Sequence, residues 1–276
     1  MADLVGVFAA SHTPVMLNFP DAVSEQDRTA VYEEFTKLGT AIAATEPTSV
    51  IVISDDHLHN FFLDNFPAFC IGAADTYQSP AEHWLKVDRH TLAGDTALSA
   101  HLLGEALQAS FDPAFSMQLT LDHGVLTPLV LAGLARQVAI VPLLVNCVQP
   151  PLPTMKRCLQ WGRLLRDAIR SYSRPDRIAI LATGGISHDV ATPRMGMVNE
   201  IFDRQFLHLL GANDDEELAS YAAEHVNEAG NGAEEIRNWL IAHGAAAGCR
   251  FEVQFYRPLP SWYTGIGLAR WHVAPQ

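Results

Sequence analysis

Two histidines that directly follow apolar segments are the residues of this sequence best placed for metal chemistry. The chain holds 12 histidines, of which His12 follows the apolar segment 4–9 and His57 follows the apolar segment 49–54. Two neutral imidazoles and one carboxylate on one face of a ferrous ion leave adjacent positions open for a substrate and O₂. We therefore expect His12 and His57 to be metal ligands, although each position also suits a histidine that only hydrogen-bonds the adjacent turn.

The segment around His57 contains further side chains that could bind a metal ion. It reads Asp55-Asp56-His57-Leu58-His59 and is the densest cluster of such residues in the chain. We choose His57 over His59 because His57 lies closer to the end of the apolar segment, and we expect His59 to be an exposed loop residue. Asp55 or Asp56 could accept a hydrogen bond from the second ring nitrogen of a metal-bound histidine.

The carboxylate ligand is expected from two adjacent glutamates, Glu234 and Glu235, which follow a glycine-containing segment and begin a predicted helix. Helical spacing places Glu235 on the side of Trp239 and Glu234 on the side of Arg237. Glu235 therefore points inward, where a carboxylate needs a cation to offset its burial. By itself, a glutamate at this place could also serve only to interact with the helix dipole.

Two more histidines are candidates for proton transfer. His188 follows the apolar segment 177–183 through a turn with two glycines, which would let a substrate approach the backbone. Since an imidazole titrates near neutral pH, we assign His188 as the acid–base catalyst. His123, in Leu121-Asp122-His123-Gly124, is a second candidate that would hydrogen-bond the substrate or an oxygen intermediate, and we rank it after His188.

Apolar strand-like segments alternate with helix-like segments along the chain, and this order is typical of an α/β fold. The near-continuous apolar runs fit strands that are buried on both faces of a sheet. We predict one domain over residues 1–276, with a central mixed, mostly parallel sheet covered by helices on both faces. The predicted strands are 4–9, 49–54, 138–145, 177–183, 251–256 and 264–271, and the predicted helices are 30–44, 97–109, 156–172, 200–210 and 216–226.

Composition excludes several classes of partner. The net charge of −13 disfavours nucleic acids and anionic membrane surfaces. The chain has no apolar run of bilayer length and no basic, apolar leader at its start, so we expect a cytoplasmic protein.

The four cysteines are scattered along the sequence, and this spacing argues against a disulfide framework or a thiolate metal site.

Several motifs, in this order along nearly the whole chain, resemble those of the class III (LigB-type) extradiol ring-cleaving dioxygenases. The motifs are Ser11-His12-x-Pro14, Asp56-His57, Phe69-Cys70-Ile71-Gly72, Asp122-His123-Gly124, Gly184-Gly185-Ile186-Ser187-His188, Pro193-Arg194-x-Gly196, Phe202-Asp203 and Glu235-Ile236-x-x-Trp239. The resemblance implies Fe(II) bound by His12, His57 and Glu235, with His188 and His123 as catalytic residues. It also implies a catecholic substrate and O₂, and either a homo-oligomer or a complex with a small accessory subunit.

One position departs from the family pattern, because Asp189 stands where related sequences usually have glutamine after the catalytic histidine. A carboxylate close to His188 would raise the pKa of that histidine. The substrate stays open among protocatechuate, gallate, substituted catechols and aminophenols. Two other readings of the residues are a zinc-dependent hydrolase with the same ligands and a metal-free binding module on the same scaffold.

Overall fold

The computed structural model describes residues 1–274, which form a large sheet, a separate two-stranded ribbon and eight α-helices among the described residues. The strands are β1 Asp3–Ala10, β2 Ser49–Asp55, β3 Phe69–Gly72, β4 Thr76–Ser79, β5 His90–Ala93, β6 Ala114–Ser116, β7 Ala139–Val145, β8 Arg177–Thr183, β9 Arg250–Leu259 and β10 Thr264–His272. The helices are α1 Val15–Asn18, α2 Glu25–Ala43, α3 Thr96–Gln108, α4 His123–Leu131, α5 Met155–Ser171, α6 Glu200–Ala212, α7 Asp215–Ala229 and α8 Ile236–Ala245. A short 3-10 helix, Asn231–Glu235, leads directly into α8.

The large sheet has eight strands in the order β6-β3-β7-β2-β8-β1-β10-β9. The four central strands β7, β2, β8 and β1 are parallel to one another, whereas β3 is antiparallel to β7, and β10 and β9 continue the other side of the sheet as an antiparallel hairpin. All residues of β2 are buried, which agrees with its continuous apolar sequence. Because the central strands are parallel, their carboxyl ends meet at one edge of the sheet, and the loops that follow them converge there.

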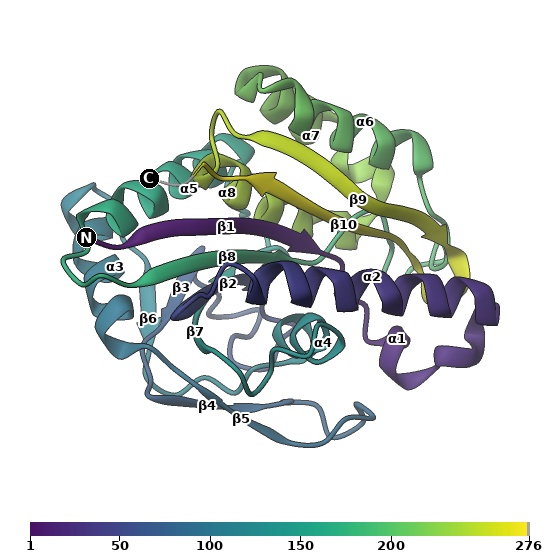
Figure 1. Cartoon of the computed structure of the whole chain (residues 1–276). Coiled ribbons are helices and arrows are strands. Elements are labelled where there is room, and N and C mark those ends of the chain that lie inside the picture. Colours follow the sequence, from purple (N-terminus) through teal and green to yellow (C-terminus); the bar gives the residue numbers. More distant parts are fainter. Residues whose placement is uncertain (275–276) are drawn as a thin grey trace.

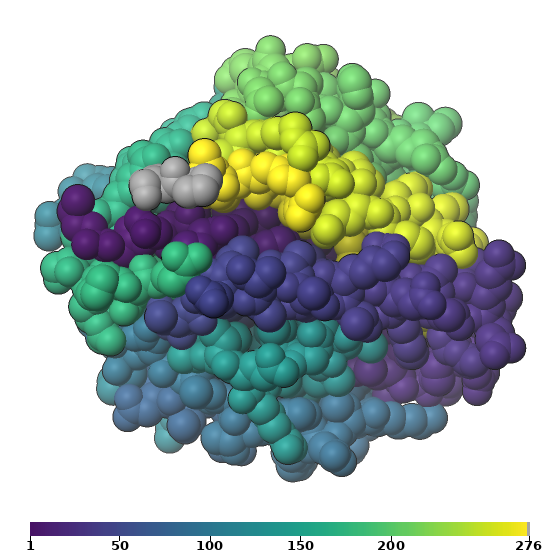
Figure 2. All heavy atoms as spheres, in the orientation of Figure 1, coloured from purple at the N-terminus to yellow at the C-terminus, as the bar shows by residue number. Residues whose placement is uncertain are grey.

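Helices cover both faces of the sheet, as predicted (Figure 1). On one face, α8 packs on β1, β2 and β8, and α5 packs on α8 and β1. On the same face, α3 contacts β3 and β7, α6 contacts β9, and α7 packs on α5 and α6. On the other face, α2 and α4 contact the sheet and each other. Figure 2 shows α2, in dark blue, as a ridge between the yellow β9–β10 hairpin and the teal segment that contains α4.

The predicted segments agree with the observed elements apart from shifts at their ends, and Phe251–Tyr256 and Thr264–Trp271 lie within the hairpin β9–β10. The sequence interpretation did not include α1, α4 or the strands β3 to β6, which are short. The sequence interpretation also put Arg237 on an outward-facing, polar side of the helix that became α8, and this was wrong. Every residue of α8 is buried, including Arg237 and Asn238. Among the described helices, none has the length and apolarity needed to cross a bilayer.

Candidate metal centre and active site

Loops at the carboxyl ends of β1, β2 and β8 bring the predicted site residues together. His12 lies two residues after β1, His57 two residues after β2 and His188 five residues after β8. Glu235 reaches the same point from the 3-10 helix before α8. Its carboxylate lies 3.2 Å from Nε2 of His12, 3.6 Å from Nε2 of His57 and 3.4 Å from Nε2 of His188.

His12 is buried and has a defined hydrogen-bond partner behind it. Its Nδ1 lies 3.2 Å from Oγ1 of Thr183, and this hydroxyl in turn donates to Ser54 at 2.9 Å. Because the threonine hydroxyl donates elsewhere, it accepts from Nδ1–H of His12. The lone pair of neutral His12 is then on Nε2, which faces Glu235, and this is the tautomer that a metal ligand needs.

His57 is oriented by Asp122 rather than by Asp55 or Asp56, so the predicted acceptor was wrong. Oδ2 of Asp122 accepts from the backbone N–H of His57 at 2.8 Å and lies 3.0 Å from its Nδ1. Asp56 instead accepts from backbone N–H groups of the loop, including that of His59 at 3.0 Å. Asp122 also caps α4 through the N–H of Gly124 at 2.9 Å, and an aspartate before His-Gly is a sequence signal that would have identified this cap.

Glu235 is buried, as predicted from the sequence, whereas Glu234 is partly exposed and pairs with Arg237. The N–H of Gly185 donates to Oε2 of Glu235 at 2.6 Å. Burial alone would raise the pKa of Glu235, but the adjacent His12 and His188 hold this pKa well below its usual range. Gly184 is required beside this carboxylate: its φ is +98°, and a Cβ there would lie 2.7 Å from Oε2.

His188 is partly buried and lies against the carboxylate of Glu235. Its Nδ1 donates to the carbonyl of Ile186 at 3.1 Å, which leaves Nε2 directed at Glu235. Although burial opposes protonation, the negative charge of Glu235 raises the pKa of His188 above its ordinary value. A group that gains and releases a proton near neutral pH is suited to acid–base catalysis.

Asp189, the residue that departs from the family pattern, does not act on His188 as expected. Its carboxylate pairs with Nε of Arg194 at 2.9 Å and accepts from the N–H of Asn231 at 3.3 Å. The shift in the pKa of His188 arises from burial, Glu235, Ile186 and Asp55. Asp189 therefore joins the loop after β8 to the segment before Glu235.

His123 belongs to the same cluster, with its ring centroid 4.1 Å from that of His57 and 5.5 Å from that of His12. Glu82 accepts from both its backbone N–H and its Nδ1. Burial and the positive charge of His57 lower the pKa of His123 to about 4. His123 is therefore neutral near pH 7, with an unprotonated Nε2. No sequence pattern predicted Glu82 as the partner of His123, because Glu82 lies in an irregular segment between β4 and β5.

The donor set fits a cation. His12, Asp55, His57 and Glu235 each offer one ligand atom, and these atoms lie within 4.8 Å of one another. Oδ2 of Asp55 is fully buried without a hydrogen-bond partner and lies 3.2 Å from Nε2 of His57. Buried carboxylates are costly unless a cation or hydrogen bonds offset their charge. Two such carboxylates beside Nε2 of two histidines are the surroundings that a divalent metal ion requires.

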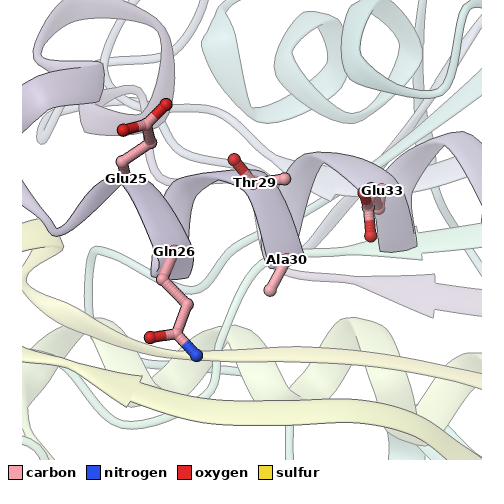
Figure 3. Close-up of a pocket in the computed structure, with 5 residues that line it drawn as sticks. All are labelled: Glu25, Gln26, Thr29, Ala30 and Glu33. Carbon is pink, nitrogen blue, oxygen red and sulfur yellow. The ribbon is translucent and has the colours of Figure 1, made fainter.

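This cluster lies in a cavity of about 460 Å³, a size that suits a small aromatic molecule. The cavity is lined by all five predicted site residues, and additionally by His59 and several apolar side chains. A larger hollow of about 540 Å³ on the outer surface of α2 is lined by Glu25, Gln26, Thr29, Ala30 and Glu33 (Figure 3). It contains no imidazole, so the chemistry is assigned to the cavity at the strand ends.

The remaining titratable groups agree with the sequence interpretation. The four cysteines are free, three of them fully buried and Cys249 half-buried. His59 is largely exposed, and its Nε2 lies 3.4 Å from Oε1 of Glu82. His243 is buried between Asp215 and Trp271 and does not line the cavity.

Comparisons with known proteins agree with the site. A 2,3-dihydroxyphenylpropionate/2,3-dihydroxicinnamic acid 1,2-dioxygenase of Burkholderia vietnamiensis is 30% identical over 93% of this chain and 94% of its own length. A gallate dioxygenase of Pseudomonas putida is 41% identical over 57% of this chain and 47% of its own length. An uncharacterized protein of Escherichia coli K12 has the same fold, with a TM-score of 0.64 at 15% identity over 96% of this chain and 99% of that one.

The model of one protein family matches residues 6–267, which include every residue of the metal cluster and both further histidines. That family is described as the catalytic LigB subunit of aromatic ring-opening dioxygenase. Since the match covers most of the chain and the relatives are named dioxygenases, the chain belongs to the LigB family of ring-cleaving dioxygenases.

Proposed function

We propose that this chain is an Fe(II)-dependent extradiol dioxygenase that opens the ring of a catechol with both atoms of O₂. His12, His57 and Glu235 would hold the iron. The observation that carries the proposal is the convergence of these three side chains, with Nε2 of both histidines facing the carboxylate. Two histidines and one carboxylate with an open cavity beside them are typical of ferrous sites that bind substrate and O₂ together.

Ferrous iron, when bound, would supply the path for electrons between the aromatic ring and O₂. The protein's own residues bind and orient the catechol and handle its protons. Nε2 of His188 takes a proton from a substrate hydroxyl and returns it later, while the carbonyl of Ile186 fixes the ring through Nδ1.

Neutral His123 has a complementary role beside His57. Its Nδ1–H is held by Glu82, so its Nε2 accepts a hydrogen bond from a substrate hydroxyl. The apolar part of the lining keeps water away from the reacting ring. Holding the substrate and the proton carrier in fixed positions lowers the entropic part of the barrier.

The test is purification and Fe(II) loading without oxygen, followed by O₂ uptake with a panel of catechols and aminophenols. We expect one O₂ consumed per catechol, a yellow ring-opened product, and loss of bound iron in His12→Ala, His57→Ala and Glu235→Ala. His208→Ala is the matched control, because His208 is exposed on α6. A protein that retains zinc, and consumes no O₂ with any of these compounds after iron loading, would contradict the proposal.

A further inference from the structure

Much of the lining of the active-site cavity is apolar, and in the described part of the chain it includes no side chain of lysine or arginine. Beyond the histidines and Glu235, its lining includes Pro14, Val15, Trp84, Val190, Met195 and Tyr263. Within residues 1–274, no Lys or Arg lines this cavity. A substituent on a bound catechol would therefore meet mostly aromatic, aliphatic and thioether groups, besides the neutral side chains of Thr13 and Thr264.

The cationic groups closest to this lining in sequence already have partners. Arg194, next to Met195, pairs with Asp189 at 2.9 Å and donates to the carbonyl of Asn227 at 3.3 Å. Lys86, two residues after Trp84, donates from Nζ to the carbonyl of Asn18 at 2.9 Å. Turning either side chain toward the cavity would break these contacts, so neither is arranged to receive an anion.

The charges that do line the cavity are negative or already balanced. Asp189 and Glu235 are carboxylates, and His59, the imidazole outside the cluster, lies 3.4 Å from Oε1 of Glu82. The net charge of −13 adds a repulsive field. A carboxylate on the substrate would lose its hydration here without gaining a charge-assisted hydrogen bond from Arg or Lys.

We infer that the substrate is a catechol whose ring substituent is uncharged and apolar, such as an alkyl, aryl or ester group. This inference rests on the proposed function and names the substrate class of the same site. It distinguishes this chain from the relatives named above, whose printed substrates, a phenylpropionate and gallate, carry a carboxylate. The cavity of about 460 Å³ has room for the ring and a substituent of several carbon atoms.

Matched pairs of acid and methyl ester test the inference, because the two members of a pair differ mainly in charge. The pairs are protocatechuate, gallate and 2,3-dihydroxyphenylpropionate, each with its methyl ester, and 4-methylcatechol is a further neutral substrate. We expect kcat/KM with the iron-loaded enzyme to be at least about tenfold higher for each ester than for its acid. Equal or higher kcat/KM for the acids would overturn the inference while leaving ring cleavage intact. No turnover of any compound would instead count against the proposed function.

The inferred preference for uncharged substituents can also be tested by a variant that adds a cationic side chain to the cavity lining. Met195→Arg places a guanidinium beside the cavity, and we expect it to shift the ester-to-acid ratio of kcat/KM by about tenfold toward the acid. Met197→Arg is the matched control, since Met197 is exposed and does not line this cavity. The inference would be overturned if Met195→Arg retains iron and folds normally but has the wild-type ester-to-acid ratio of kcat/KM. It would also be overturned if Met197→Arg shifts this ratio as much as Met195→Arg does.

Discussion

A Cβ placed on Gly232 would lie 2.1 Å from Nε2 of His188, so the backbone of residue 232 is the surface against which this imidazole packs. The N–H of Gly232 also donates to the carbonyl of His188 at 3.1 Å. The two residues come from the loop after β8 and from the 3-10 helix that contains Glu235. The proposed acid–base group and the proposed carboxylate ligand are therefore positioned by the same short segment.

Gly232→Ala is expected to displace the ring of His188, because the added methyl group would occupy the position of Nε2. A misplacement of about 1 Å in a catalytic group lowers the rate on the order of a hundredfold. We expect kcat to fall by that factor while iron content stays at the wild-type level, as measured by metal analysis and O₂ uptake.

Gly104→Ala is the matched control, because a Cβ at Gly104, within α3, meets no atom within 4 Å. Alanine there should leave activity unchanged and slightly raise stability. If Gly232→Ala keeps wild-type kcat, the close contact with His188 does not position the catalytic imidazole.

Asp122→Asn is expected to weaken metal binding without unfolding the protein. Asparagine caps a helix as well as aspartate does, so the cap of α4 at Gly124 is kept. The substitution removes the negative charge that accepts from Nδ1 of His57 at 3.0 Å. Loss of such a partner typically lowers metal affinity by about 10- to 100-fold.

The affinity of Asp122→Asn is best measured by anaerobic titration with Fe(II), or with Co(II) as a spectroscopic substitute. Asp56→Asn is a useful comparison, because Asp56 holds the loop through backbone N–H groups rather than through an imidazole. Equal metal affinities for wild type and Asp122→Asn would show that Asp122 does not set the tautomer of His57.

The histidines of the site could be predicted from the sequence because the central strands are parallel and their carboxyl ends meet. His12, His57 and His188 each follow one of these strands, so the strand ends located them in space. Glu235 was also predicted to point inward, but for an incomplete reason. It lies in a 3-10 helix before α8, and α8 is buried on all sides rather than on one face.

The partners behind the histidines could not be predicted in the same way. Glu82 and Trp84 reach the site from an irregular segment between β4 and β5, which has no periodic pattern. Asp55 was one of two candidates, with Asp56, for the partner of a ligand's second nitrogen, yet its free oxygen faces the nitrogen on the metal side of His57. Side-chain direction at the end of a strand depends on the turn that follows, and a sequence pattern does not give that turn.

Asp203, which is not one of the proposed metal ligands, is expected to make the free energy of unfolding depend on pH. Its carboxylate is buried and accepts from the N–H and Oγ of Ser187, both at 2.9 Å, and from the hydroxyl of Tyr256 at 2.7 Å. Burial outweighs these hydrogen bonds and raises the pKa of Asp203 to about 6. The Asp203 carboxylate is therefore protonated at a higher pH in the folded protein than in the unfolded chain, where aspartates have a pKa of about 4.

The stabilising contribution of protonated Asp203 is present below about pH 4 and is lost as pH rises through about 6. Asp203→Asn removes the titration. Between about pH 4 and pH 7, we expect the wild type to lose on the order of 2 kcal/mol of unfolding free energy relative to the variant. Urea unfolding of both metal-free proteins at several pH values measures this difference. Parallel pH dependence of the two proteins would contradict the prediction.

Asp55→Asn is expected to have opposite effects on the metal-free and metal-loaded proteins. Burial raises the pKa of Asp55 to about 6, so above that pH the metal-free protein contains a buried charge whose Oδ2 has no hydrogen-bond partner. Asparagine keeps the contact between Oδ1 and Nδ2 of Asn238 at 3.3 Å and removes the charge. The metal-free variant should therefore be more stable than the wild type by on the order of 1 kcal/mol near pH 8. With a divalent metal ion bound, the carboxylate offsets the positive charge, so the gain in melting temperature on adding Fe(II) or Co(II) should be smaller in the variant.

Thermal unfolding with and without metal measures both effects of Asp55→Asn in one experiment. If the substitution lowers the stability of the metal-free protein and leaves the gain from metal unchanged, Asp55 serves the fold alone and not the metal centre.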